Sequence, residues 1–194
     1  MYGKRVCAWK GHVEVLRVLL KHNADPNRAT TDDGTTPVFV AAQEGHVDVL
    51  RVLMEYNADP NKASADDGCS PVYVGAQDGH AEVVKVLLEN TADPNQTETD
   101  DGSTPLYMAA EDGHLETVKV LLAHKADPNQ ATTDDATTPV YMAAQEGHAD
   151  VVKVLLESNA DPNLARTDGW TPLKQATQKG HAAAVDLLKQ HGAV

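Results

Sequence analysis

The sequence has few of the residues that mark several common protein classes. It contains two cysteines, Cys7 and Cys69, and aromatic residues make up 4% of its 194 residues. The cysteines lie far apart in the chain, so no disulfide framework is indicated and we expect free thiols. No hydrophobic run approaches the roughly 20 residues of a membrane span. Residues 1–10 are too few and too polar for a signal peptide. These absences predict a soluble protein, cytoplasmic if it is a natural one.

Positive charge is also scarce. Sixteen Lys and Arg residues stand against 29 Asp and Glu residues, which gives a formal net charge of -13. A surface of this sign repels phosphate groups, so we predict that neither nucleic acid nor a membrane is a partner. The chain also lacks a glycine-rich phosphate loop and any local signature of a nucleophile with its base. We therefore predict no enzymatic activity and no cofactor.

Repetition, by contrast, is present throughout the chain. Three markers recur with the same phase at steps of 34 residues, except that the last step is 33 residues in two of the three series. Gly-His pairs begin at Gly11, Gly45, Gly79, Gly113, Gly147 and Gly180. Ala-Asp-Pro-Asn begins at Ala24, Ala58, Ala92, Ala126 and Ala160. Thr-Pro or Ser-Pro begins at Thr36, Ser70, Thr104, Thr138 and Thr171.

Each unit has the signals of two helices. Thr36 is a helix N-cap, and Pro37 follows at the first helical position, where its missing N–H costs nothing. This predicts a short first helix over 38–44, which Gly45 ends, and a second helix over 47–56. The second helix is too widely hydrophobic to pack on a single neighbour, so the units must stack on one another.

The residues Asp101 to Asn129 closely resemble the ankyrin repeat consensus. They contain Asp-Gly-x-Thr-Pro, Ala-Ala-x-x-Gly-His, Val-Lys-Val-Leu-Leu and Ala-Asp-Pro-Asn in that order. The resemblance covers essentially the whole chain. It implies an all-α repeat solenoid, in which stacked helix-turn-helix units are joined by β-turn or hairpin loops. Residues 1–194 then form one domain: an N-terminal cap (1–27), internal repeats (28–61, 62–95, 96–129 and 130–163) and a C-terminal cap (164–194).

The terminal units differ from the internal ones, as solenoid caps must. Lys4 and Arg5 in the first unit stand at positions that are hydrophobic in the internal repeats. Lys174 and Gln175 do the same in the last unit. We therefore expect a monomer. The units are so alike that we favour an engineered, consensus-type array. A protein made to study repeat stacking, without a selected ligand, and a fragment of a natural intracellular adaptor remain as alternatives.

Histidines and paired aspartates raise the question of metal binding. Helices in neighbouring units lie about 8 to 10 Å apart, so histidines one repeat apart are poorly placed to share a zinc ion. In the resembled family the Gly-His histidine serves instead in hydrogen bonding between repeats. The paired aspartates at the turns lack the alternating oxygen ligands and distal Glu of a calcium loop. We predict no metal site.

The resemblance implies that turn tips and first helices line a concave groove that binds a protein. We predict an acidic groove that suits a partner with a basic surface. Its predicted turn residues are Asp33, Thr35, Asp67, Cys69, Asp101, Ser103, Asp135, Thr137 and Trp170. Its predicted helix residues are Trp9, Gln43, Glu44, Gln77, Asp78, Glu111, Asp112, Gln145, Glu146 and Gln178, with Tyr107 and Tyr141 from an aromatic ladder. That ladder (Phe39, Tyr73, Tyr107 and Tyr141) either packs internally or faces the groove.

Overall fold

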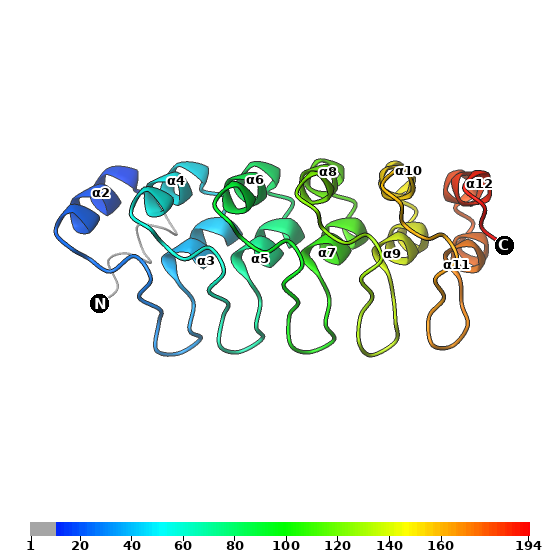
Figure 1. Ribbon diagram of the computed structural model, residues 1–194, viewed down its shortest axis with the longest axis horizontal. Coiled ribbons are helices and arrows are strands. Elements are labelled where there is room, and N and C mark those ends of the chain that lie inside the picture. Colours follow the sequence, from blue (N-terminus) through cyan, green and yellow to red (C-terminus); the bar gives the residue numbers. More distant parts are fainter. Residues whose placement is uncertain (1–10) are drawn as a thin grey trace.

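A computed structural model describes residues 11–194 as a single row of helix pairs joined by long turns (Figure 1). The second helices of the units form one layer: α2 (Val13–Lys21), α4 (Val47–Glu55), α6 (Ala81–Glu89), α8 (Leu115–Ala123), α10 (Ala149–Glu157) and α12 (Ala182–Gln190). The first helices form the other: α3 (Pro37–Gln43), α5 (Pro71–Gln77), α7 (Pro105–Glu111), α9 (Pro139–Glu146) and α11 (Pro172–Lys179). Within residues 11–194 there are no strands. The predicted all-α solenoid is confirmed.

The helix boundaries follow the predicted signals. Thr36 caps α3, because the Phe39 N–H donates to its Oγ1 over 3.2 Å, and Pro37 is the first helical residue. Gly45 lies in the left-handed region with φ of 74° and ends the helix. The observed bounds of α3 and α4 lie within one residue of the predicted ones. Ser70, Thr104, Thr138 and Thr171 cap the other first helices in the same way.

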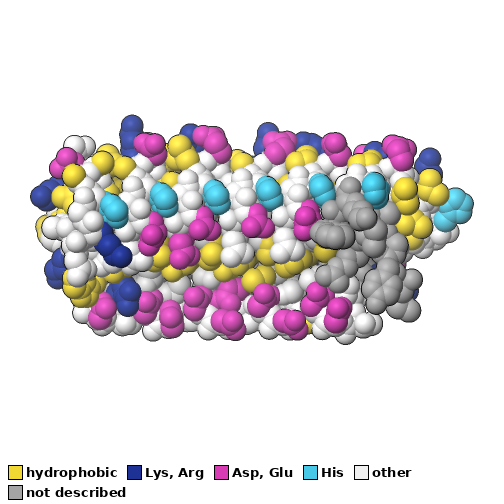
Figure 2. Space-filling model, turned by 180° about the vertical axis from the view of Figure 1, so that it is seen from behind, with side chains coloured by type: hydrophobic (Ala, Val, Ile, Leu, Met, Phe, Trp, Pro, Cys, Tyr) yellow, Lys and Arg dark blue, Asp and Glu magenta, His cyan; other side chains and the backbone are white. Residues whose placement is uncertain are grey.

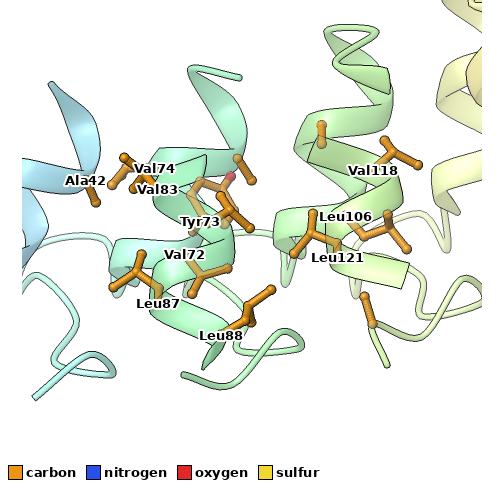
Figure 3. Close-up of a cluster of buried hydrophobic side chains, with 14 of the residues drawn as sticks. Ala42, Val72, Tyr73, Val74, Val83, Leu87, Leu88, Leu106, Val118 and Leu121 are labelled. Carbon is orange, nitrogen blue, oxygen red and sulfur yellow. The ribbon is translucent and has the colours of Figure 1, made fainter. Parts of the chain in front are cut away.

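The hydrophobic core runs from unit to unit without a break. Figure 3 shows side chains from three successive units packed together, with Ala42 from the first, Val83 and Leu87 from the second, and Leu106 and Leu121 from the third. All five of these side chains are buried. Because α4, α6, α8 and α10 each contact the second helices on both sides, no internal unit buries its hydrophobic residues alone.

One polar atom is buried in this core without a partner. Thr117 in α8 is 1% exposed, and its Oγ1 has no hydrogen bond. The equivalent residues in α6 and α10 are Val83 and Val151, which are also buried.

Thr117→Val should therefore stabilise the protein by about 1 kcal/mol, because it replaces an unpaired buried hydroxyl with a methyl group. The urea midpoint measures this change. Thr104→Val is the matched control: the Thr104 hydroxyl caps α7, so its loss should destabilise by about 1 kcal/mol. A lower midpoint for Thr117→Val would show that this hydroxyl has a partner.

The turns between helix pairs are joined to one another by backbone hydrogen bonds. Within one turn the Thr30 N–H donates to the Thr35 carbonyl over 3.0 Å. Between turns the Ala65 N–H donates to the Asp33 carbonyl over 3.0 Å, and the same bond recurs from Thr99 to Asp67, Thr133 to Asp101 and Thr167 to Asp135. The hairpin loops therefore form a continuous ribbon along one edge of the solenoid.

The asparagines of Ala-Asp-Pro-Asn also bridge neighbouring units. Asn61 accepts from the Asp93 N–H over 2.8 Å and donates from Nδ2 to the Thr91 carbonyl over 3.2 Å. Asn95, Asn129 and Asn163 repeat this double contact with the unit that follows. A short polar side chain thus fixes the spacing of the units on the side opposite to the Gly-His pairs.

The residue before each Ala-Asp-Pro-Asn has a left-handed backbone. Asn23, Asn57, Thr91, Lys125 and Asn159 have φ between 57° and 69°. Asparagine adopts this conformation readily, but a β-branched threonine does so with strain.

Thr91→Gly should accordingly raise stability by about 1 kcal/mol, and Asn57→Gly should raise it less. Denaturant midpoints of the two variants compare them directly. Equal effects would mean that the threonine side chain is not strained at this φ.

The two ends of the solenoid are unlike. Val15 and Val18 in α2 are 52% and 56% exposed, whereas the equivalent Val49 and Val52 in α4 are 0% and 1% exposed. At the other end Lys174 is exposed, in agreement with a polar cap. Lys4 and Arg5, on which the predicted N-terminal cap depends, lie outside the described residues. None of the helices within residues 11–194 is long and hydrophobic enough to cross a membrane.

Candidate binding face

The first helices reach solvent mainly at their C-terminal ends. Pro37 to Ala42 of α3 are all buried, whereas Gln43 and Glu44 at its C-terminal end are exposed. The same division recurs in the other units. We call the solvent side of the first helices, together with the adjoining turns, the first-helix face.

Histidines fix the C-terminal ends of α3, α5, α7 and α9 to the next unit. His80 Nε2 lies 3.1 Å from the Gln43 carbonyl, and His114 Nε2 lies 3.0 Å from the Gln77 carbonyl. His148 contacts Glu111 and His181 contacts Gln145 in the same way. A carbonyl oxygen only accepts, so Nε2 carries the proton in each contact. The predicted role of the Gly-His histidines in bonding between repeats is confirmed.

The helix-end residues of the predicted groove are largely accessible. Gln43, Glu44, Gln77, Asp78, Asp112, Glu146 and Gln178 are exposed, and Glu111 and Gln145 are half-buried. Burial raises the pKa of Glu111, and the neighbouring carboxylates of Asp112, Glu146 and Asp101 raise it further. The ends of α3, α5, α7 and α9 thus carry closely spaced negative charge.

Four predicted turn residues point inwards instead. The side chains of Thr35, Cys69, Ser103 and Thr137 are buried, with exposures of 2% to 8%. Thr35 Oγ1 donates to Asp33 within its own turn, and Ser103 Oγ lies 2.9 Å from the Tyr73 hydroxyl of the preceding unit. Their assignment as contact residues was wrong, because this position closes the turn. Burial also raises the pKa of the Cys69 thiol to about 12, which makes it unreactive.

The second aspartate of each pair has a structural task in the turn. Asp33 Oδ1 accepts from the Thr35 N–H over 3.1 Å, and Asp101 Oδ1 accepts from the Ser103 N–H over 2.8 Å. Asp67 and Asp135 make the equivalent contacts, and all four residues are half-buried. Their carboxylates therefore have little free capacity for a partner.

The first aspartate of each pair is the exposed one. The residues assigned to the groove from the sequence are the half-buried second members of the pairs, and the exposed Asp32, Asp66, Asp100 and Asp134 were omitted. The signal that could have found them is the spacing of an Asx turn, in which an aspartate binds the N–H two residues later. That rule assigns the second aspartate to the turn and leaves the first for solvent.

The aromatic ladder packs internally at three of its four positions. Phe39, Tyr73 and Tyr141 are buried, whereas Tyr107 is half-buried. Tyr141 is 2% exposed and lies beneath the Arg166 guanidinium, 5.7 Å from the ring centroid, so its assignment to the groove was wrong. Tyr107 keeps an accessible ring, as does half-buried Trp170. Trp9 lies outside the described residues.

The charges and the hydrophobic side chains form parallel lines on this face. Figure 2 shows a hydrophobic band along the solenoid with a row of acidic side chains on either side of it. Two sets of acidic residues are exposed at the first helices and the turns. We define the helix-end carboxylates as Glu44, Asp78, Asp112 and Glu146, and the tip carboxylates as Asp32, Asp66, Asp100 and Asp134.

The described residues contain no group of three or more His, Cys, Asp or Glu side chains that could hold a metal ion. The regular spacing of the units explains this finding, because equivalent carboxylates recur one unit apart and do not converge.

The comparisons with known proteins agree with this architecture. A family model described as ankyrin repeats (3 copies) matches residues 5–98, 76–166 and 127–194. The crystal structure of an ankyrin repeat domain from Acinetobacter baumannii AYE, at 1.00 Å resolution, superposes with a TM-score of 0.91 at 28% identity, over 100% of this chain and 99% of that one. No curated protein matches the sequence. The unit length, the histidine contacts and the family match together place this chain in the ankyrin repeat family.

Proposed function

We propose that the protein is a non-enzymatic scaffold that binds a protein partner with a basic surface through its first-helix face. Ankyrin repeats are generally protein-interaction modules, which supports the class of function. The observation that carries the finer proposal is the pair of acidic rows on either side of a hydrophobic band (Figure 2). Opposite charge steers a basic partner to this face, and the hydrophobic band supplies contact area. The scaffold acts as a monomer, and the near identity of its units favours an engineered origin.

Trp170 is the aromatic anchor that we assign to this interaction. Its ring is half-buried at the last turn, and its backbone N–H donates to Asp168 Oδ1 over 3.1 Å, which holds the residue in place. Partly exposed tryptophans at the edge of a binding face often carry a large share of the binding energy.

Trp170→Ala should weaken binding by about 2 kcal/mol, with little loss of stability. The measurement is a titration against the ligand recovered by pull-down from a lysate. Association should also slow as the salt concentration rises, because the acidic rows are exposed.

Glu116→Lys on α8 is the control, since Glu116 is exposed on a second helix and pairs only with Lys119 over 2.6 Å. This variant should leave the affinity nearly unchanged. If it disrupts binding and Trp170→Ala does not, the partner uses the second-helix side, and the assignment to the first-helix face fails.

A further inference from the structure

The acidic rows of the first-helix face repeat with a fixed step. Each helix-end carboxylate lies at or directly after the end of one first helix, and the helices of neighbouring units pack against each other. Packed helices lie about 8 to 10 Å apart, so successive carboxylates in one row are separated by about the same distance. A partner that meets several of them at once must present its basic groups with the same step.

The hydrophobic band is accessible mainly at its centre. In α7 both Tyr107 and Met108 are half-buried, whereas the equivalent Tyr73 and Val74 in α5 are buried. The centre of the face thus offers hydrophobic side chains between the two rows.

Side-chain amides recur beside the helix-end carboxylates. Gln43 and Gln77 are exposed at the ends of α3 and α5. An amide side chain both donates and accepts, so it can bind the N–H and C=O groups of an extended chain. An α-helix has no such groups to spare along its sides, since it pairs them internally.

We propose that the occupant of this face is an extended, polyproline II-type segment with a basic residue at every third position. This proposal deepens the proposed function and rests on it. Such a segment has three residues per turn and rises about 3.1 Å per residue, so equivalent side chains recur about every 9.3 Å. Its lysine or arginine side chains meet successive helix-end carboxylates. A second line of hydrophobic side chains meets Tyr107 and Met108, and the amides of Gln43 and Gln77 bind its main chain.

A β-strand fits this face less well. Successive side chains of a strand point to opposite sides, so basic residues three positions apart would face away from each other. A polyproline II helix has three residues per turn, so every third side chain lies on one side. The distance between those side chains matches the distance between neighbouring units.

The test uses two synthetic peptides of one composition and different order, together with a third peptide that forms a helix. The first peptide is Lys-Pro-Leu repeated five times. The second contains the same residues, but its lysines occupy every second position from the start of the peptide. A third is a helix-forming peptide with lysines seven positions apart. Kd is measured by fluorescence anisotropy with the whole chain at low and at physiological salt.

We expect the first peptide to bind at least about tenfold more tightly than the second. Equal affinities of the first two peptides, or tighter binding of the helical peptide, would overturn the extended arrangement but leave an acidic binding face in place. If none of the three peptides binds at low salt, the proposed function fails as well.

Two protein variants locate the contact. Asp78→Lys should weaken binding of the first peptide about tenfold, because it reverses one charge within a row. Glu89→Lys makes the same change in net charge on α6, where Glu89 is exposed at the end of a second helix, and should have at most a twofold effect. Equal losses from the two variants would mean that overall charge, and not the step of the row, governs binding.

Discussion

Gly113→Ala is expected to destabilise the protein by about 3 kcal/mol. Gly113 has φ of 73°, a conformation that costs an alanine about 1 to 2 kcal/mol. A Cβ added there would also lie 2.6 Å from Cε1 and Nδ1 of His148, closer than such atoms approach one another. The His148 ring cannot move away without losing its hydrogen bond to the Glu111 carbonyl, which is worth about 1 kcal/mol.

Gly180 provides a matched control for this substitution. It has the same place in the last described unit and φ of 81°, but nothing lies within 4 Å of an added Cβ. Gly180→Ala should therefore cost only the backbone strain of about 1 to 2 kcal/mol. Urea unfolding of the two variants gives the difference, which isolates the contact between a glycine and the histidine of the next unit. Equal losses would show that this contact adds nothing to stability.

The fold was predictable because every unit repeats the same local signals. Thr36 with Pro37 fixes the start of a helix and Gly45 fixes its end, and four further copies of this pattern confirm the phase. The hydrophobic second helices then require stacking, since no single unit can bury them. Errors in the boundaries of α3 and α4 are confined to one residue.

The binding face was predictable only in part. Sequence position indicates which residues belong to a turn, but not which side chains the turn uses for its own hydrogen bonds. Thr35 and Asp33 bind each other within the turn, so neither is free for a partner, whereas the adjacent Asp32 is exposed. Similarly, Tyr141 is covered by Arg166, a contact between residues of different units that no local pattern reveals.

Glu98 was not singled out from the sequence, although it makes the densest set of hydrogen bonds in any turn described. It occupies the position of Thr30, Ser64 and Thr132 in the other units and is 8% exposed. Its carboxylate accepts from the N–H groups of Asp100 over 2.7 Å, Asp101 over 2.7 Å and Gly102 over 2.8 Å. These donors stabilise the ionised form of a buried acid.

The ionisation of Glu98 is therefore tied to folding. Burial raises the pKa of Glu98, but the backbone donors outweigh it, so the pKa lies below its ordinary value. Asp101 behaves in the opposite way: burial and the adjacent Glu98 carboxyl raise its pKa. A group whose pKa is lowered on folding stabilises the protein above its unfolded-state pKa, and this stabilisation is lost as the pH falls through the folded-state value.

Glu98→Gln should destabilise the protein by about 2 kcal/mol at pH 7. The amide keeps one acceptor oxygen, but its NH₂ group faces the Asp100 N–H, so two donors oppose each other and the charge is lost. The difference from the unchanged protein should shrink as the pH falls below about 4.3, the ordinary pKa of glutamate, because Glu98 in the unfolded state of the unchanged protein then gains a proton, whereas the variant has no carboxyl there. Urea midpoints between pH 7 and pH 3 measure this, with Glu89→Gln on the exposed end of α6 as a control that should change little at any pH. A loss for Glu98→Gln that stays constant down to pH 3 would show that the shape of the side chain, and not its charge, holds this turn together.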